Sequence, residues 1–317
     1  MLVLRSVVEK FKNAKKIAIF NHINPDGDAH GSAFALKLAL QTLGKPAEVF
    51  LRAGDDLTKE YKLVKGTEKS HLAISDCDLL VAVDCADRER LGEFGEIFQG
   101  NTVAIDHHIT HKPFADTTLV VADSPATGEI IFDVVKALGV EITHHIAYNL
   151  YLAIVCDTGC FKYSSTTAKT HAVAAELINT GIDFADMTKR LFDSKSWEYL
   201  QMYKKGIESL EVYADGKIAL LAFCEEDFKN AGISETDADG MVNLPNSVAG
   251  IEVGVYIRQR GDMFKVSLRS SGRLDVAKIA EEFGGGGHER ASGFSMKLPL
   301  SCVKSTIVEK LKTALES

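Results

Sequence analysis

Hydrophobic residues follow two different spacings along the first half of the chain. Short runs rich in β-branched and apolar residues predict strands, and longer stretches with apolar residues every three or four positions predict helices. Strands are expected at 16–20, 79–83 and 102–105, and helices at 31–43, 128–138, 145–156 and 170–179. Alternation of strands and helices is typical of βαβ units. The first half is therefore expected to form an α/β domain with a doubly wound, mostly parallel sheet.

The pattern changes after residue 187. Over 188–207, apolar residues recur at helical spacing but are interleaved with Lys, Asp and Glu, which predicts a helical connector. Further on, Asp215-Gly216 and Arg260-Gly261-Asp262 each separate two apolar runs and predict two hairpins. A helix is expected over 275–283, ahead of four consecutive glycines. The sequence thus predicts an α/β domain at 1–187, a connector at 188–207 and a smaller α+β domain at 208–317.

The length agrees with two domains, because the chain has 317 residues and a typical domain has roughly 150. The chain carries 44 acidic and 36 basic residues, a net charge of −8, which argues against a broad basic surface that coats nucleic acid or an anionic membrane. No apolar run approaches the roughly 20 residues of a membrane span, and the charged N-terminus does not resemble a signal peptide. A cytoplasmic protein is therefore expected, with its six cysteines as reduced, mostly buried thiols.

Acidic and histidine side chains follow each of the three predicted strands and one further apolar stretch. They are His22, Asp26, Asp28, Asp84, Asp106, His107, His108 and Asp157. Ligands of open α/β sheets bind beyond the carboxyl ends of the strands, so these side chains are expected to converge. A single such carboxylate is better explained as a helix cap or a solvated loop residue. This explanation does not account for carboxylates from several segments that meet at one edge of the sheet.

So many carboxylates in one place would repel one another unless cations held them together. Carboxylate oxygens with a few imidazoles suit Mn²⁺ or Mg²⁺, and they fit Zn²⁺, Fe²⁺ or Co²⁺ less well. Two divalent ions about 3.5–4 Å apart, bridged by a carboxylate and by a water or hydroxide, form an arrangement that hydrolyses phosphate esters. The sequence therefore predicts a two-metal hydrolytic site.

A second candidate site lies at the four glycines 284–287 and the following His288. Consecutive glycines leave backbone amides free to approach a phosphate closely, and the histidine adds a side-chain donor. Without the histidine and the first domain, a flexible end of the preceding helix would be the better interpretation. In this chain a phosphate-binding loop is the favoured hypothesis.

The motif Asp106-His107-His108 resembles the signature of the DHH phosphoesterase family. More narrowly, the chain is similar to the stand-alone nanoRNase and pAp-phosphatase branch, in which a DHH-associated domain follows the DHH domain. Matching segments stand in the same order at 22–32, 83–87, 106–108, 156–159 and 284–288. The resemblance therefore covers nearly the whole chain and implies the same two-domain fold.

The resemblance also implies roles for the site residues. One metal ion would be held by His22, Asp26 and Asp84, and the other by Asp28, Asp84, His107 and Asp157. Asp84 would bridge the two ions, His108 would polarise the scissile phosphate or donate a proton, and Asp106 would orient a histidine. Substrate contacts would come from Arg269, Gly286, Gly287 and His288. His30 departs from the family, which more often has an aliphatic residue there, and a buried or capping histidine is expected.

The implied activity is a manganese-dependent phosphoesterase that removes mononucleotides from very short oligoribonucleotides and hydrolyses pAp, with Mg²⁺ or Co²⁺ as alternative metals. Cyclic or linear dinucleotides are the nearest alternative substrates. Long single-stranded DNA is disfavoured because the acidic chain lacks an extended basic channel, and pyrophosphate because the glycine segment with Arg269 resembles the oligonucleotide branch. A non-catalytic nucleotide sensor is disfavoured because none of the family's metal positions is lost. The sequence leaves the oligomeric state open, and a homodimer is compatible with it.

Overall fold

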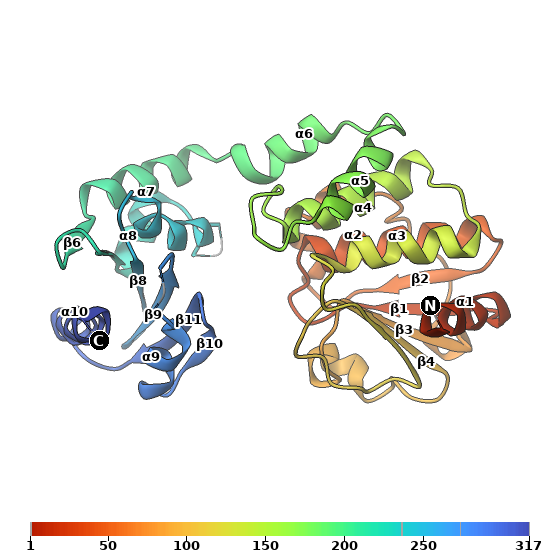
Figure 1. The fold of residues 1–317 in the computed structure, drawn as a ribbon, viewed down its shortest axis with the longest axis horizontal. Coiled ribbons are helices and arrows are strands. Elements are labelled where there is room, and N and C mark those ends of the chain that lie inside the picture. Colours follow the sequence, from red (N-terminus) through yellow and green to blue (C-terminus); the bar gives the residue numbers. More distant parts are fainter. Residues whose placement is uncertain (1, 236, 273, 317) are drawn as a thin grey trace. The chain divides into compact units, whose positions relative to one another are not determined.

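The chain forms two compact units, Met1–Ser194 and Lys195–Ser317, each with its own hydrophobic core (Figure 1). The computed structural model describes residues 2–235, 237–272 and 274–316. The boundary between the units falls inside the segment 188–207, which the sequence predicts as a connector.

The segment 188–207 is divided between the two units. Helix α6 (Phe184–Thr188) continues into a π-helical turn, Lys189–Asp193, and helix α7 (Trp197–Glu208) begins after an extended interruption. The hydroxyl of Ser196 accepts a hydrogen bond from the amide of Tyr199 and caps α7. The helical pattern that the sequence shows across this segment is thus broken by a cap.

The first unit contains a five-stranded sheet in the order β2-β1-β3-β4-β5, and every neighbouring pair is parallel. The strands are β1 (Ile17–Phe20), β2 (Ala47–Phe50), β3 (Leu79–Val83), β4 (Thr102–Asp106) and β5 (Thr117–Val120). The prediction of a parallel α/β sheet and of its three central strands is confirmed. The edge strands β2 and β5 escape the sequence pattern because each is short and contains polar residues.

Helices share one hydrophobic core with a single face of this sheet, and some of them pack on other helices rather than on the strands (Figure 1). They are α1 (Leu2–Asn13), α2 (Gly27–Thr42), α3 (Thr127–Leu138), α4 (His144–Asp157) and α5 (Ala168–Ile178). The opposite face is covered by shorter segments, among them the 3-10 helices η3 (Ile74–Asp76) and η4 (Glu89–Gly95). Burial on both faces explains why the central strands are continuous apolar runs.

Helix α2 begins at Gly27 rather than at residue 31, where the hydrophobic pattern starts. Asp26 caps the helix, because its Oδ1 accepts hydrogen bonds of 3.1 Å from the amides of Asp28 and Ala29. The first turn lacks large apolar residues and therefore leaves no helical pattern in the sequence. In consequence, Asp28 stands in the first turn of a helix and not in a flexible loop.

Helices α2 and α4 approach each other closely at Gly31. A Cβ atom at this position would lie 2.4 Å from the carbonyl oxygen of Asn149 and 2.9 Å from the amide nitrogen of Ala153. Both are backbone atoms of α4, so no change of rotamer could relieve the clash. The glycine therefore sets the distance between the helix that carries Asp28 and the helix that ends at Asp157.

A buried ion pair joins α2 to the edge strand β2. Nζ of Lys37 lies 2.7 Å from Oε1 of Glu48, and both side chains are almost fully buried. Burial alone would raise the pKa of Glu48, but hydrogen bonds from Lys37 and Ser70 outweigh burial and lower it. A charged residue is therefore tolerated inside β2 because its partner is built into the facing helix.

We expect the first unit to lose the stabilisation by this ion pair in acid. Because the folded-state pKa of Glu48 is lowered, its contribution is complete above the unfolded value of about 4.3 and is lost as the pH falls through the folded value. Glu48→Gln should reduce the free energy of unfolding by about 2 kcal/mol at neutral pH and by less in acid. Urea unfolding at pH 7 and at about pH 3.5 measures both differences. A difference that does not change with pH would contradict this account.

The second unit contains a six-stranded mixed sheet in the order β10-β11-β9-β8-β7-β6. Its strands are β6 (Glu211–Tyr213), β7 (Ile218–Phe223), β8 (Val253–Arg260), β9 (Met263–Ser270), β10 (Gly286–His288) and β11 (Ala291–Met296). The pairs β6–β7 and β8–β9 are the two predicted antiparallel hairpins, and β7 pairs with β8 in parallel. The α+β prediction for this part of the chain is confirmed.

Helices cover both faces of the second sheet. Helices α9 (Val276–Glu282) and α10 (Leu300–Glu316) pack on one face, and α7 and α8 (Glu225–Ala231) pack on the other, over β7 and β8. The prediction of a glycine-rich loop is wrong in part, because Gly286, Gly287 and His288 form the edge strand β10 and pair with β11.

All six cysteines are free thiols, but Cys85 is the only buried one. The prediction of mostly buried thiols is therefore wrong, because most of the cysteines stand in loops or at helix ends. Within the described residues, no helix is both long enough and apolar enough to span a membrane.

Candidate active site

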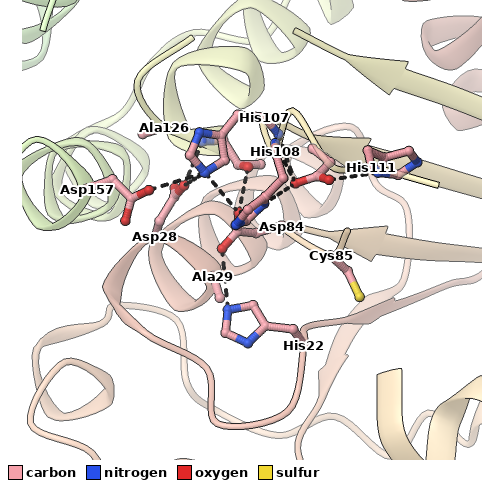
Figure 2. A network of polar contacts seen from close by, with 12 residues as sticks. His22, Asp28, Ala29, Asp84, Cys85, His107, His108, His111, Ala126 and Asp157 are labelled. Carbon is pink, nitrogen blue, oxygen red and sulfur yellow. Dashed lines mark hydrogen bonds and ion pairs between the residues drawn. The ribbon is translucent and has the colours of Figure 1, made fainter. Parts of the chain in front are cut away.

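The polar side chains that follow the strands gather at the carboxyl edge of the parallel sheet (Figure 2). The chain runs from β1 to β2 on one side of β1 and then to β3 on the other, so the strand order reverses between β1 and β3. Ligands of open α/β sheets bind at such a reversal. His22 follows β1, Asp84 follows β3 and Asp106 ends β4, whereas Asp157 comes from the last turn of helix α4.

Asp84 lies at the centre of this cluster. Its side chain is 2% exposed, with Oδ2 3.5 Å from Nε2 of His22 and Oδ1 3.6 Å from Nε2 of His107. Oδ1 also accepts a hydrogen bond of 2.9 Å from the hydroxyl of Thr127. The backbone φ of Asp84 is 57°, in the left-handed region, which is uncommon for a residue with a side chain and is often found at functional sites. The carboxylate thus faces a histidine with each of its oxygens.

Two groups of side chains that could each hold a metal ion meet at this carboxylate. They are His22, Asp26 and Asp84, and Asp28, His107 and Asp157, and a third, overlapping group joins Asp84 to His107 and His108. Nε2 of His22 lies 3.9 Å from Oδ1 of Asp26. Nε2 of His107 lies 3.2 Å from Oδ2 of Asp157 and 3.8 Å from Oδ2 of Asp28. Such spacings suit ligands of a single ion with bonds of about 2.1 Å.

Backbone carbonyls orient the two histidines. Nδ1 of His22 lies 2.8 Å from the carbonyl oxygen of Ile23, and Nδ1 of His107 lies 3.2 Å from that of Ser124. A carbonyl oxygen only accepts, so Nδ1 carries a hydrogen in both rings, and Nε2 is the atom left to bind a metal ion. Metal-binding histidines are commonly fixed in this way.

Asp28 is fully buried and is held by the first residues of α3. Its Oδ2 accepts a hydrogen bond of 2.6 Å from the amide of Thr127, and its Oδ1 accepts bonds of 2.9 Å from the amide of Gly128 and 2.8 Å from the hydroxyl of Ser32. The positive end of the helix dipole favours a carboxylate at this place. Thr127 therefore contacts both Asp28 and Asp84, although no sequence motif marks it as a site residue.

The electrostatics of the cluster fit a divalent cation. Burial and the charges of Asp84 and Asp157 raise the pKa of Asp28 well above its usual range. Burial alone would lower the pKa of His107, but the contacts with Asp157, Asp28 and Asp84 outweigh burial and raise it to about 10. Nε2 of His107 is buried and faces the carboxylates of Asp157, Asp84 and Asp28 without a hydrogen bond of regular geometry. An ion bound there would replace the protons that these groups otherwise attract.

His108 is placed differently from His107. Its Nδ1 lies 2.7 Å from Oδ1 of Asp106, and about a third of its side chain is exposed. The hydrogen bond to Asp106 outweighs burial and raises the pKa of His108. Because Nδ1 is engaged with Asp106, only Nε2 remains for a ligand. The other oxygen of Asp106 lies 2.7 Å from Nδ1 of His111, a residue that the sequence analysis does not single out.

His30 is fully buried, as the sequence analysis expects, and it lies outside both groups of ligands. Its ring meets that of Tyr61 edge-on, with centroids 5.4 Å apart. Burial lowers the pKa of His30 to about 4. His30 is therefore a neutral core residue of α2.

In the second unit, Arg269 and His288 stand in one row across the sheet. Ala291 of β11 pairs with Arg269 of β9 on one side and with His288 of β10 on the other. Residues paired in this way point to the same face, here the face opposite to α9 and α10. Their backbones are about 10 Å apart, two strand spacings. A Cβ atom on Gly287 would lie 2.6 Å from the carbonyl oxygen of Ala291, whereas one on Gly286 would meet open space.

Residues 16–154 match the family model described as DHH family, N-terminal domain, and residues 216–317 match the DHHA1 domain. The bifunctional oligoribonuclease and PAP phosphatase NrnA of Thermus thermophilus is 34% identical to this chain, over 98% of this chain and 94% of its own. The chain belongs to the DHH family. The family membership that the motif at residues 106–108 predicts is thereby confirmed.

Further known proteins match this chain over most of its length. The protein of the same name from Bacillus subtilis is 26% identical, over 88% of this chain and 89% of its own. The crystal structure of an exopolyphosphatase-related protein from Bacteroides fragilis matches with a TM-score of 0.85 and 25% identity, over 100% of this chain and 98% of its own. The match therefore extends through both units.

Proposed function

We propose that this DHH-family protein is a divalent-metal-dependent phosphoesterase that releases mononucleotides from very short oligoribonucleotides and converts pAp to AMP. The observation that carries the proposal is the convergence of carboxylates and imidazoles on Asp84 at the carboxyl edge of the sheet. The substrate class is supported by relatives named as oligoribonuclease and PAP phosphatase, which match nearly the full chain.

The two groups of ligands are proposed to hold two ions, with Asp84 shared between them. One ion would be bound by His22, Asp26 and Asp84, and the other by Asp28, Asp84, His107 and Asp157. Manganese is proposed as the activating metal, because mixed carboxylate and imidazole ligands suit it. When bound, such ions activate a water molecule and neutralise the charge that develops on the phosphate.

His108 is proposed to contact the scissile phosphate through Nε2. Its Nδ1 donates to Asp106, which fixes the ring and leaves Nε2 as the free polar atom. The raised pKa favours the protonated ring, so His108 can donate a hydrogen bond to a phosphate oxygen or a proton to the leaving group.

Arg269, His288 and the glycines of β10 are proposed to bind the substrate. The arginine and the histidine project from one face of the sheet. Guanidinium and imidazole donors suit phosphate oxygens. The glycines leave room for close approach to the backbone.

An assay panel tests the proposed function. Chelator-treated protein is assayed alone and with Mn²⁺, Mg²⁺ or Co²⁺ on ribodinucleotides, pentaribonucleotides, pAp, cyclic dinucleotides, single-stranded DNA and pyrophosphate. We expect release of mononucleotides from the oligoribonucleotides and of AMP from pAp, only with metal and fastest with Mn²⁺. Undiminished activity without metal, or a preference for pyrophosphate or long DNA, would contradict the proposal. Tight nucleotide binding without turnover would favour the sensor hypothesis.

A pair of arginine variants tests the substrate-binding part. Arg269→Ala should raise KM by about 10- to 100-fold with little change in kcat, because a hydrogen bond to a charged group contributes about 1.5–3 kcal/mol. Arg260→Ala is the matched control, since Arg260 ends β8 and pairs with Glu235. Equal effects of the two substitutions would show that Arg269 has no specific role.

A further inference from the structure

His111 occupies a buried place beside the site without belonging to either group of metal ligands. It ends a tight turn that starts at His108, because its amide donates a hydrogen bond of 3.1 Å to the carbonyl oxygen of His108. Its side chain is 4% exposed, and its ring packs against Phe114 with centroids 5.5 Å apart. Figure 2 shows the ring on the opposite side of the cluster from Asp157.

Asp106 is held between two imidazole rings. Its Oδ1 lies 2.7 Å from Nδ1 of His108, and its Oδ2 lies 2.7 Å from Nδ1 of His111. A carboxylate only accepts, so both Nδ1 atoms carry the hydrogen. Oδ1 also accepts a hydrogen bond of 2.9 Å from the amide of His107. Among the described residues, His111 is the only one that donates a hydrogen bond to Oδ2 of Asp106, and the other donors contact Oδ1.

The two hydrogen bonds act on different parts of the Asp106 side chain. Rotation about the Cβ–Cγ bond moves both oxygens, and with them the acceptor of His108, so donors on both oxygens restrict this rotation more than donors on Oδ1 alone. A donor on Oδ2 fixes the plane of the carboxylate. The plane in turn fixes the direction of the Nδ1–H bond of His108, and therefore the direction in which its Nε2 points.

We propose that His111 is a positioning residue, which locks Asp106 through Oδ2 and thereby aims Nε2 of His108 at the scissile phosphate. This inference rests on the proposed function, because it assigns His108 to the phosphate. It adds His111 to the expected pair of Asp106 and His108, so that the three side chains form one chain of hydrogen bonds.

The environment of His111 determines which substitutions can replace it. Its Nε2 is buried and has no hydrogen-bond partner among the described residues, so Nδ1 is the ring atom that contacts Asp106. The amide nitrogen of asparagine can take the place of Nδ1, whereas that of glutamine takes the place of Nε2. Phenylalanine keeps the ring contact with Phe114 and donates nothing. The proposal therefore predicts that asparagine restores function and that glutamine and phenylalanine do not.

Steady-state kinetics on pAp and a ribodinucleotide with saturating Mn²⁺ test the proposal. His111→Phe and His111→Gln should lower kcat by about 10- to 100-fold, the usual effect of removing a residue that orients an active-site group, with KM and Mn²⁺ affinity within about twofold of wild type. His111→Asn should stay within about threefold of wild type in kcat. His145→Phe, an exposed histidine at the start of α4, is the matched control and should leave kcat unchanged. Thermal unfolding identifies any variant that loses activity through its fold.

Three results would overturn the proposal. They are wild-type kcat in His111→Phe, equal loss in His111→Asn and His111→Phe, and a loss confined to KM or to Mn²⁺ affinity. A wild-type protein that hydrolyses no nucleotide would refute the proposed function instead. In that case NMR still tests the positioning, through the downfield proton on Nδ1 of His108. Loss of this signal in His111→Phe and its retention in His111→Asn would support the proposal, and an unchanged signal in both would overturn it.

Discussion

Asp84→Asn is expected to reduce the hydrolysis of pAp and of dinucleotides by at least about 10³-fold. Bound metal ions contribute several kcal/mol to transition-state stabilisation, and each 1.4 kcal/mol or so corresponds to a factor of ten in rate. Asparagine keeps the size of the side chain and an oxygen for the hydroxyl of Thr127, but it removes the negative charge that is proposed to be shared between two metal ions. The loss should therefore appear in kcat/KM for every substrate.

The choice of asparagine rather than alanine follows from the backbone at this position. With φ at 57°, Asp84 adopts a conformation that asparagine tolerates far better than most residues. Alanine would add backbone strain to the loss of the carboxylate, and the two effects could not be separated. Asp84→Asn is therefore expected to melt within a few degrees of wild type, so that lost activity reports on the metal centre.

Metal content and a second variant complete this experiment. Elemental analysis after dialysis against Mn²⁺ should find less bound metal in Asp84→Asn than in wild type. Asp116→Asn is the matched control, because Asp116 accepts a hydrogen bond from the amide of Thr102, the first residue of β4, at the amino edge of the same sheet. Wild-type activity and metal content in Asp84→Asn would refute the role given to this residue.

Gly31→Ala should lower the free energy of unfolding of the first unit by about 3 kcal/mol, at the upper end of the usual effect of overpacking. The added methyl group would lie 2.4 Å from a carbonyl oxygen of α4, and relief of this contact requires the two helices to move apart. Chemical unfolding followed by circular dichroism measures the loss. Gly286→Ala is the matched control, because the same methyl group would meet open space there and stability should be unchanged.

Gly31→Ala should also reduce kcat by about 100-fold in protein that remains folded, since a displacement of about 1 Å in an active site can have an effect of this size. Helix α2 carries Asp28 in its first turn, and α4 ends at Asp157. Moving the helices apart therefore separates two carboxylates that face His107 and are proposed as metal ligands. Normal kcat in a destabilised but folded Gly31→Ala would show that the helix spacing and the site geometry are independent.

The sequence predicts those parts of the site that depend on local pattern. A buried strand followed by Asp or His is visible as an apolar run with a polar end, which places Asp84 and the residues at 106–108 correctly. The role of Asp26 as the cap of α2 follows less directly, because the first turn of that helix carries small and polar residues. A pattern based on hydrophobic spacing therefore starts the helix too late.

Other parts of the site depend on contacts that no local pattern records. Thr127 reaches Asp28 across 99 positions of sequence, and the role of His111 depends on which oxygen of Asp106 faces it. The strand β2 escapes prediction because Glu48 is polar, and its burial is made acceptable by the facing Lys37 and by the amide of Ser70. These features belong to the packed chain, because each depends on contacts between residues that are far apart in the sequence or on the orientation of one side chain.

The edge strand β10 has a consequence for self-association. An exposed sheet edge presents unpaired amides and carbonyls that can recruit a strand from another molecule. Here the edge strand has three residues, all exposed, and Gly287 has a φ of 145°, outside the range of regular strands. A strand so short and irregular offers little template for further pairing. The glycines proposed to admit substrate therefore also limit strand pairing with other molecules at this edge of the second sheet.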